Sequence, residues 1–348
     1  MKEKQGQEIT GKQTVQVAIV GAGPTGVELA VALTRAGVDF LLFDAGQVGH
    51  TIAWWPKHTR FYSTSERIAM SGLPLTIFDQ QHPTNDEYLA YLRGVVQQFD
   101  IQIQTYESVE RVEKMANDTF HLTTSHKGQQ RQYQARFVVL ATGGMAQPRL
   151  LNIPGENLPH VSHYLHDPHD YFQQELLVVG GRNSAVEYAL RCWRAGAKVT
   201  LSYRRAELPN KSIKPALMQD LETVVREGKI KFLPGTIPVE INSYSVKLAE
   251  TDLHGQPIQG QEQNLPFDFV LLCTGYQADV RLFKQLGVKL QGVEQAPTNN
   301  PETMETNVAG VFVLGTAAGG TQSKFTHFIE TSHAHVPKIL QAIQARLA

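Results

Sequence analysis

The sequence predicts an α/β protein built from two three-layer domains, each organised around a parallel sheet. The first observation is a strand, a glycine-rich turn, a helix and a second strand at residues 16–46. The second observation is that the same order of elements recurs at 175–205. The third is that 348 residues with 42% hydrophobic content suit about two domains, each large enough to bury its own core.

The stretch at 16–46 reads QVAIVGAGPTGVELAVALTRAGVDFLLFDAG. Its near-continuous apolar strand is followed by Gly21, Gly23 and Gly26, which satisfy the spacing G-x-G-x-x-G. These glycines permit a tight turn, a close approach of the backbone to a pyrophosphate, and packing of the helix on the strand. The second strand ends at Asp44, about 20 residues past the turn, where an acid accepts hydrogen bonds from a ribose hydroxyl. This setting favours a Rossmann-like dinucleotide site over a fortuitous glycine turn.

The second unit, at 175–205, departs from the first in two ways. Arg182 stands where the middle glycine is expected, so the backbone is less open and a guanidinium there can itself meet a phosphate. The second strand ends in Tyr203, Arg204 and Arg205 instead of an acid. Two arginines at that position favour recognition of a 2′-phosphate, and hence NADP over NAD, although a solvated surface pair is the plain alternative.

Two such units in one chain predict two dinucleotides. NADPH is a hydride donor, and the acceptor that most economically fills the first site is FAD. The stretches at 136–144 and 267–279 are apolar strands that end in Thr-Gly, as elements that close such domains in two-dinucleotide flavoproteins do. Near the end, 306–320 is a strand followed by small residues, where a last FAD turn is expected.

The domain organisation follows from the order of these elements. Residues 1–154 and 279–348 are expected to form a discontinuous FAD-binding domain, and 155–278 an NADPH-binding domain inserted between its two parts. Repetition of the nucleotide unit is the internal repeat that the sequence shows.

Composition and charge exclude several classes of protein. With 32 basic and 33 acidic residues, the net charge is −1, and no basic face for nucleic acid is indicated. No apolar run reaches the roughly 18 residues that a membrane span needs, and the first residues lack the apolar core of a secretory signal. The expected location is the cytoplasm, without a membrane or nucleic-acid partner.

The chain has two cysteines, Cys192 and Cys273, far apart in the sequence. A C-x-x-C dithiol and a zinc framework are therefore both absent from the sequence. Cys192 falls in a helical pattern and Cys273 ends an apolar strand, so both are expected to be small core residues.

The chain resembles the low-molecular-weight, thioredoxin reductase-type flavoproteins, and most of all the bacillithiol disulfide reductase family. The pieces that carry the resemblance are GHTI at 49–52, FYSTSERIAMSGLPL at 61–75, HPTNDEYLAYLRGV at 82–95, VSHYLHDPHDYF at 161–172, VVGGRNSAVEYAL at 178–190 and SIKPALMQDLE at 212–222. The resemblance spans nearly the whole chain. It implies an FAD- and NADPH-dependent oxidoreductase, expected to be a homo-oligomer, that reduces the disulfide of a small thiol without a protein dithiol.

The turn patterns and the resemblance together predict the residues of both cofactor sites. Expected FAD contacts are Gly21, Gly23, Pro24, Thr25, Gly26, Asp44, Gly49, His50, Thr51, Ala141, Thr142, Gly143, Gly315, Thr316 and Phe325. Expected NADPH contacts are Gly181, Arg182, Asn183, Ser184, Tyr203, Arg204, Arg205, Thr274 and Gly275.

One departure from the family pattern bears on the chemistry. Family members commonly carry a cysteine just before the last glycine of the FAD turn, and here that position is Thr25. A threonine hydroxyl is not ionised near pH 7 and forms no mixed disulfide, whereas a thiolate is both nucleophile and leaving group. We therefore expect Thr25 to be at most a hydrogen-bonding residue of the catalytic site. Thr316 stands where the superfamily usually has an acid after the glycine of the last FAD turn, but this replacement, like Arg182, also occurs in the family that the chain resembles.

Two groups of histidines raise the question of a metal or a proton donor. His160, His163, His166 and His169 recur every third residue, and His327, His333 and His335 lie close to the C-terminus. No carboxylate or thiolate partner has the spacing of a metal site, so no metal is expected. The first group is expected at the surface of the linker, and His327 and His333 are candidate proton donors to a departing thiolate.

Three functions remain open on the sequence alone. The first is reduction of a thiol disulfide or another small oxidised acceptor by the flavin. The second is a flavin monooxygenase, whose F-x-G-x-x-x-H fingerprint is not matched by LPHVSHYLHDPHDY in the linker. The third is a redox sensor that binds both nucleotides without turnover.

Overall fold

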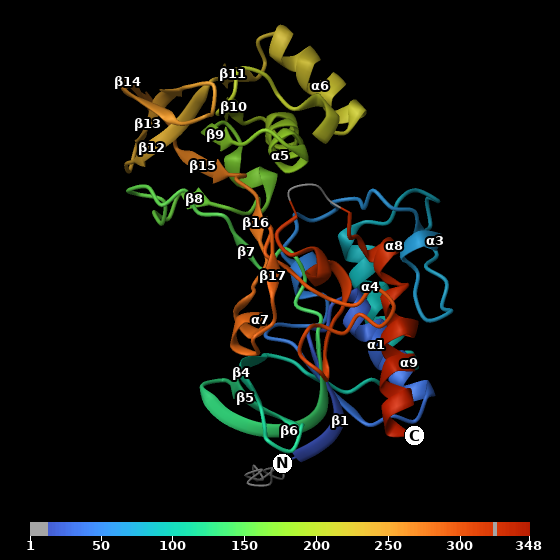
Figure 1. Ribbon diagram of the computed structural model, residues 1–348. Helices are drawn as coiled ribbons and strands as arrows, with labels where there is room; N and C mark the ends of the chain where they lie inside the picture. Colours follow the sequence, from blue (N-terminus) through green and yellow to red (C-terminus); the bar gives the residue numbers. More distant parts are fainter. Residues whose placement is uncertain (1–12, 323–325) are drawn as a thin grey trace, which may run out of the picture. The chain divides into compact units, whose positions relative to one another are not determined.

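The computed structural model describes residues 13–322 and 326–348. Within these residues the chain divides into two compact units (Figure 1). Unit 1 consists of 13–53, 58–147 and 276–348, and unit 2 consists of 54–57 and 148–275. The last part of unit 1, 276–348, therefore follows unit 2 in the chain.

Unit 1 is built on a seven-stranded sheet. Its strands are β1 (Gln13–Val20), β2 (Phe40–Phe43), β3 (Ile103–Gln104), β4 (Glu107–Lys114), β5 (Phe120–His126), β6 (Gln129–Leu140) and β19 (Val311–Val313). The order is β3-β2-β1-β6-β5-β4, and β19 also pairs with β6. The pairs β1/β2, β1/β6, β2/β3 and β6/β19 are parallel, whereas β4/β5 and β5/β6 are antiparallel. The parallel part brings the carboxyl ends of β1, β6 and β19 to one edge.

Helices and smaller elements complete unit 1. The helices are α1 (Pro24–Arg35), α2 (His50–Ala53), α3 (Ser65–Ile68), α4 (Asn85–Gln98), α7 (Arg281–Gln285), α8 (Ile329–Ser332), α9 (His335–Leu347) and the 3₁₀ turn η3 (Gly315–Gly319). Short two-stranded sheets are formed by β7 (Gln147–Pro148) with β16 (Tyr276–Gln277), and by β17 (Leu290–Gln291) with β18 (Ala296–Pro297). Helix α1 packs against α9 and α4, and these three helices lie side by side in Figure 1.

Local sequence explains where two of these helices begin. Pro24 occupies the first turn of α1, where its missing N–H costs nothing and its fixed φ suits a helix. Helix α4 starts with a capping box, in which the Thr84 hydroxyl accepts from the Glu87 N–H at 3.2 Å. The Glu87 carboxylate accepts from the Thr84 N–H at 2.8 Å, so two backbone donors are satisfied reciprocally.

Unit 2 has three layers. Its central sheet contains β11 (Lys231–Pro234), β10 (Lys198–Tyr203), β9 (Glu175–Val179), β15 (Phe269–Leu272) and β8 (Val161–Ser162), in that order. The pairs along this sheet are parallel. The helical layer consists of α5 (Asn183–Arg194) and α6 (Pro215–Arg226), with the 3₁₀ turns η1 (Pro168–Tyr171) and η2 (Asn210–Ser212). The third layer is an antiparallel sheet of β12 (Thr236–Ile241), β13 (Ser245–Thr251) and β14 (Pro257–Pro266).

Alternation along β9 fixes this layering. Leu176 and Val178 belong to the apolar cluster formed with α5 and α6, whereas Leu177 and Val179 belong to the cluster formed with β12 and β13. Because successive side chains of a strand point to opposite faces, one continuous apolar run serves both layers. The predicted α/β class with two Rossmann-like, three-layer domains is confirmed, while the antiparallel parts of both units are additions that the glycine turns do not signal.

Candidate cofactor and catalytic site

The turn between β1 and α1 has the geometry that a pyrophosphate needs. Gly21 has a φ of +112°, and a Cβ at this position would lie 2.4 Å from the Ala141 carbonyl oxygen. A Cβ at Gly26 would lie 2.0 Å from the carbonyl oxygen of Gly21, whereas nothing lies within 4 Å of a Cβ at Gly23. The first and third glycines thus permit close packing, and the second leaves open space beside the start of α1.

The N-terminus of α1 is available to an anion. Gly23 is the N-cap, no side chain of the described residues caps this end, and the first turn, which includes Pro24, carries no acid. Backbone N–H groups and the positive end of the helix dipole attract phosphate at such a position. The residues therefore fit the phosphates of a dinucleotide.

Asp44 lies at the end of β2 next to this turn. Its carboxylate accepts hydrogen bonds from the N–H groups of Ala22 and Gly46, each at 2.8 Å. Burial raises the pKa of Asp44, and the two backbone hydrogen bonds and His50 oppose that shift. The position of Asp44 in the sequence predicts a ribose contact but not this second role, in which the same carboxylate shapes the turn.

The residues 49–51 lie beside the same turn. The Gly49 N–H donates to the Ala22 carbonyl at 3.0 Å, so the start of α2 is held against the first glycine turn. A Cβ at Gly46 would lie 2.5 Å from the ring of His50, which places that ring over Gly46. The predicted FAD residues Gly49, His50 and Thr51 are thus close to the turn in space.

Two further predicted segments meet at the carboxyl ends of β6 and β19. The Gly144 N–H donates to the Thr316 hydroxyl at 3.1 Å, which ties the end of β6 to η3. The Thr142 hydroxyl oxygen is buried and has no hydrogen-bond partner among the described residues. A buried hydroxyl without a partner is unusual in a native protein, and a polar ligand at this edge would supply one.

Thr25 faces the same place from α1. Its side chain is buried, and a Cβ at Gly315 would lie 2.4 Å from the Thr25 hydroxyl oxygen. Gly315, with a φ of +74°, therefore lets η3 approach the first glycine turn. The structure thus brings the segments around Thr25, Thr142 and Gly315 together, at the edge of a parallel sheet where nucleotides bind. Phe325, also predicted to contact FAD, lies outside the described residues.

The C-terminal histidines have three different environments. His335 is buried, its Nδ1 accepts from the Gly315 N–H at 3.3 Å, and burial lowers its pKa to about 4. The ring of His327 lies 6.1 Å from that of His335, and burial lowers the pKa of His327. The sequence predicts His335 in one group with His327 and His333, but nothing in the pattern SHAHV shows which of its histidines faces the last glycine turn.

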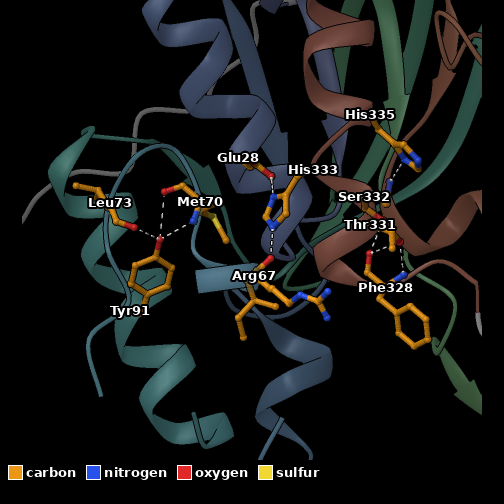
Figure 2. A network of polar contacts seen from close by, with 12 residues as sticks. Glu28, Arg67, Met70, Leu73, Tyr91, Phe328, Thr331, Ser332, His333 and His335 are labelled. Carbon is orange, nitrogen blue, oxygen red and sulfur yellow. Dashed lines mark hydrogen bonds and ion pairs between the residues drawn. The ribbon is translucent and has the colours of Figure 1, made fainter. Parts of the chain in front are cut away.

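His333 is held on both sides by protein groups. Its Nδ1 lies 2.7 Å from the Glu28 carboxylate, and its Nε2 lies 3.0 Å from the Arg67 carbonyl (Figure 2). The hydrogen bond to Glu28 raises the pKa of His333, against the effect of burial. A ring whose two nitrogens are both engaged is poorly placed to hand a proton to a substrate.

The glycine turn of unit 2 lies between β9 and α5. A Cβ at Gly180 would lie 2.5 Å from the Cys273 carbonyl oxygen, and one at Gly181 would lie 2.4 Å from the ring of Tyr203. Arg182 is the exposed N-cap of α5, and no side chain of the described residues caps this helix. Ser184 follows in the first turn, so the predicted NADPH residues frame an open helix N-terminus.

Asn183 has a structural task in this turn. Its amide donates to the Ser212 carbonyl at 3.2 Å and accepts from the Lys214 N–H at 2.8 Å. The side chain thereby holds the segment before α6 against the start of α5. This use of both ends of the amide was not visible from the sequence, where Asn183 was predicted to contact NADPH.

Arg204 and Arg205 are exposed and have no ion-pair partner within the described residues. Their main chain is anchored, because the Thr251 hydroxyl donates to the Arg204 carbonyl at 2.9 Å and the Gly235 N–H donates to the Arg205 carbonyl at 3.0 Å. Two guanidinium groups on a fixed backbone suit recognition of a phosphate.

Thr274 and Gly275 follow β15 at the same edge of the sheet as the turn of unit 2. The Thr274 hydroxyl donates to the Arg149 carbonyl at 2.6 Å, and the Gly275 carbonyl accepts from the Arg149 N–H at 2.9 Å. These two predicted NADPH residues are therefore joined to the segment that follows β7.

Both cysteines lie in unit 2 and are poor nucleophiles. Burial raises the pKa of Cys192 to about 12, and it also raises the pKa of Cys273. Neither thiol forms a disulfide in the structure. Because the thiolate is the reactive form, neither side chain is set up for thiol chemistry near neutral pH.

Over 13–322 and 326–348, no group of three or more His, Cys, Asp or Glu side chains is arranged to hold a metal ion. No helix within the same residues is both long enough and apolar enough to cross a membrane.

Comparison with known proteins identifies the class. Residues 18–315 match the family model described as pyridine nucleotide-disulphide oxidoreductase, and the chain belongs to this family. It is an oxidoreductase, and membership of the family implies the predicted cofactors FAD and NADPH.

Three named proteins that match nearly the whole chain show which members of the family it resembles. The chain is 34% identical to bacilliredoxin reductase Bdr of Bacillus subtilis over 328 residues, which cover 94% of this chain and 97% of that protein. The structure of the bacillithiol disulfide reductase Bdr of Bacillus cereus matches with a TM-score of 0.89 and 32% identity, over 96% of this chain and all of that one (100%). The Staphylococcus aureus enzyme of the same title matches with a TM-score of 0.87 and 31% identity, over 97% and 100%. The predicted resemblance is confirmed.

Proposed function

We propose that this protein is an FAD-dependent enzyme that uses NADPH to reduce a low-molecular-weight thiol disulfide, of which bacillithiol disulfide is the leading candidate. The reaction is NADPH + H⁺ + RSSR → NADP⁺ + 2 RSH. The observation that carries the proposal is the convergence of Thr25, Thr142 and Gly315 at the edge of the parallel sheet in unit 1. The names of the relatives that match over nearly the whole chain support the substrate class.

The residues of unit 1 would hold FAD and those of unit 2 NADPH. The backbone of the turn at Gly23 would bind the pyrophosphate, and Asp44 would bind the ribose, since each of its oxygens has a further lone pair. Arg204 and Arg205 would bind the 2′-phosphate. When bound, the flavin supplies the two-electron chemistry that joins the oxidation of NADPH to the reduction of a disulfide.

Thr25 and His327 would act on the substrate rather than form a bond with it. The Thr25 hydroxyl would donate a hydrogen bond at this edge, because it cannot act as a thiolate. His327 would deliver a proton to a departing sulfur from its Nε2, since its Nδ1 contacts the Thr326 hydroxyl at 3.0 Å, while His333 is engaged by Glu28 and His335 by Gly315. Because burial lowers the pKa of His327, the protonated fraction of its ring falls as the pH rises out of the acid range. We therefore predict that proton delivery to the sulfur slows over the same rise in pH.

The competing functions have weaker support. A flavin-containing monooxygenase of Stenotrophomonas maltophilia matches with a TM-score of 0.71 at 17% identity, which shows the fold alone. The linker lacks the monooxygenase fingerprint, and we do not propose that activity.

Two measurements on the purified protein test the proposal. Heat-released flavin should run as FAD on a column, because the glycine turn and Asp44 suit an adenosine diphosphate half that FMN lacks. NADPH oxidation should then be fastest with bacillithiol disulfide when quinones, oxygen and other thiol disulfides are compared. Release of FMN would overturn the cofactor assignment. Rapid flavin reduction with no effective acceptor would favour a redox sensor.

The cysteines provide a further prediction. The double variant Cys192→Ala/Cys273→Ala should oxidise NADPH and reduce the disulfide at a rate near that of the wild type. The physical reason is that both thiols are held in their protonated form by burial. Steady-state turnover checks this, with thermal unfolding as the control for the cavities that the substitutions leave. A mixed disulfide between substrate and Cys192 or Cys273, trapped by mass spectrometry, would contradict it.

A further inference from the structure

The segment 326–335 contacts two parts of the proposed FAD site through two of its histidines. His333 meets Glu28, which lies on α1 one helical turn beyond Thr25. His335 meets the N–H of Gly315, which lies against the Thr25 side chain. One short stretch of chain therefore touches both the helix that follows the first glycine turn and the last glycine turn.

The contacts of His333 require a doubly protonated ring. An ionised carboxylate and a backbone carbonyl both accept hydrogen bonds, and a neutral imidazole has only one N–H to donate. With Nδ1 at 2.7 Å from Glu28 and Nε2 at 3.0 Å from the Arg67 carbonyl, the imidazolium satisfies both acceptors at once. The side chains of His333 and Glu28 are only 24% and 14% exposed, so water replaces this pairing poorly.

Charged groups from the neighbouring helices favour the cation as well. On α3, the Arg67 guanidinium lies 3.6 Å from Glu330 of α8, whose carboxylate also raises the pKa of His333. On α4, Tyr88 and Tyr91 are the titratable side chains near Glu28, and both have a raised pKa, so they stay neutral. On α9, the first residue is the neutral His335.

The Arg67 carbonyl is itself part of a fixed segment. The Tyr91 hydroxyl accepts from the Met70 N–H at 2.7 Å and contacts the Leu73 carbonyl at 2.8 Å, while the Tyr88 hydroxyl donates to the Ile68 carbonyl at 3.0 Å. Figure 2 shows His333 between this segment and Glu28. The ring thus joins α1 to a part of the chain that α4 already holds in place.

We propose that His333 is a positioning residue, whose protonated ring ties the segment 326–335 to α1 and thereby strengthens the retention of FAD. The proposal rests on the proposed function in naming FAD as the ligand. Because the folded pKa of His333 is raised above its ordinary value of about 6.5, the tie is complete below that pH. It is lost as the pH rises through the folded pKa, so FAD should be held less firmly on the alkaline side.

The test measures FAD dissociation by flavin fluorescence from about pH 6 to about pH 9.5 in three variants and the wild type. Wild-type affinity should fall about tenfold over this range, which corresponds to loss of one hydrogen bond to a charged group. His333→Gln and Glu28→Gln should show the weaker affinity already at the acid end and little change with pH. The control variant His58→Gln removes a histidine whose ring lies 3.5 Å from the Asp86 carboxylate; the side chains of His58 and Asp86 are 80% and 47% exposed. This variant should behave like the wild type.

The thermal midpoint of the apoproteins gives a second, activity-free readout. The midpoint of the wild type should decline relative to that of His333→Gln as the pH rises through the same range. Equal pH dependence of FAD retention in the wild type and in His333→Gln would overturn the proposal. Purification of a protein that binds no FAD at all would instead overturn the proposed function, and the thermal midpoints would then decide whether His333 ties the two segments.

Discussion

Replacement of Gly26 with alanine should leave the protein unable to retain FAD. The added Cβ would lie 2.0 Å from the Gly21 carbonyl oxygen, and this oxygen belongs to the backbone of the turn rather than to a flexible side chain. The turn must open to relieve the contact, and Gly21 itself is fixed against Ala141. Overpacking of this kind costs about 3 kcal/mol, which corresponds to about a hundredfold loss of affinity.

The ratio of flavin to protein absorbance after purification measures this effect. Gly94→Ala is the matched control, because Gly94 is an exposed glycine inside α4 and a Cβ there meets nothing within 4 Å. That substitution should leave FAD content unchanged and raise stability by about 0.5 kcal/mol. Full flavin content in Gly26→Ala would show that the turn of unit 1 does not hold the cofactor.

The second large effect concerns the choice of nicotinamide nucleotide. The double variant Arg204→Gln/Arg205→Gln should lose at least about a hundredfold in kcat/KM for NADPH, while the value for NADH changes little. Hydrogen bonds from a guanidinium to a phosphate contribute roughly 1.5–3 kcal/mol each. NADH has no 2′-phosphate, so its binding does not depend on these hydrogen bonds. The two side chains are exposed, so their removal leaves no cavity in the core.

A charge-matched control separates this effect from a general loss of positive charge. Arg226→Gln/Lys231→Gln removes two exposed cations of unit 2, one at the end of α6 and one at the start of β11. Its preference for NADPH should equal that of the wild type. If the variant at 204 and 205 kept its original ratio of NADPH to NADH efficiency, those arginines would not read the 2′-phosphate.

The sequence predicts those features that depend on short-range patterns. The spacing of Gly21, Gly23 and Gly26 between an apolar strand and a helix is a local requirement of one turn, and the structure has that turn. The same holds for the second strand–turn–helix unit, whose α/β layers are present in unit 2. Burial of Cys192 is also predictable, because it lies in an apolar stretch, whereas Cys273, predicted to be a core residue as well, is only partly buried.

Contacts between distant positions could not be predicted in this way. Glu28 and His333 are 305 positions apart, and Gly315 and His335 belong to different elements. Which of several neighbouring histidines faces a given residue depends on the path of the chain around 326–335, and a pattern of residue types does not specify that path. The second roles of Asp44 and Asn183 were missed for a related reason, since a polar side chain at a turn serves a ligand or the backbone with the same atoms.

In the proposed reaction, NADPH reduces a small disulfide through the flavin without a protein dithiol. The most direct test is an anaerobic single-turnover experiment on the cysteine-free variant, Cys192→Ala/Cys273→Ala. We predict that one equivalent of NADPH bleaches the flavin absorbance, and that added bacillithiol disulfide restores it with release of two thiols per flavin. The proposed reaction would be contradicted if NADPH bleached the flavin in both proteins but the disulfide reoxidised it only in the wild type.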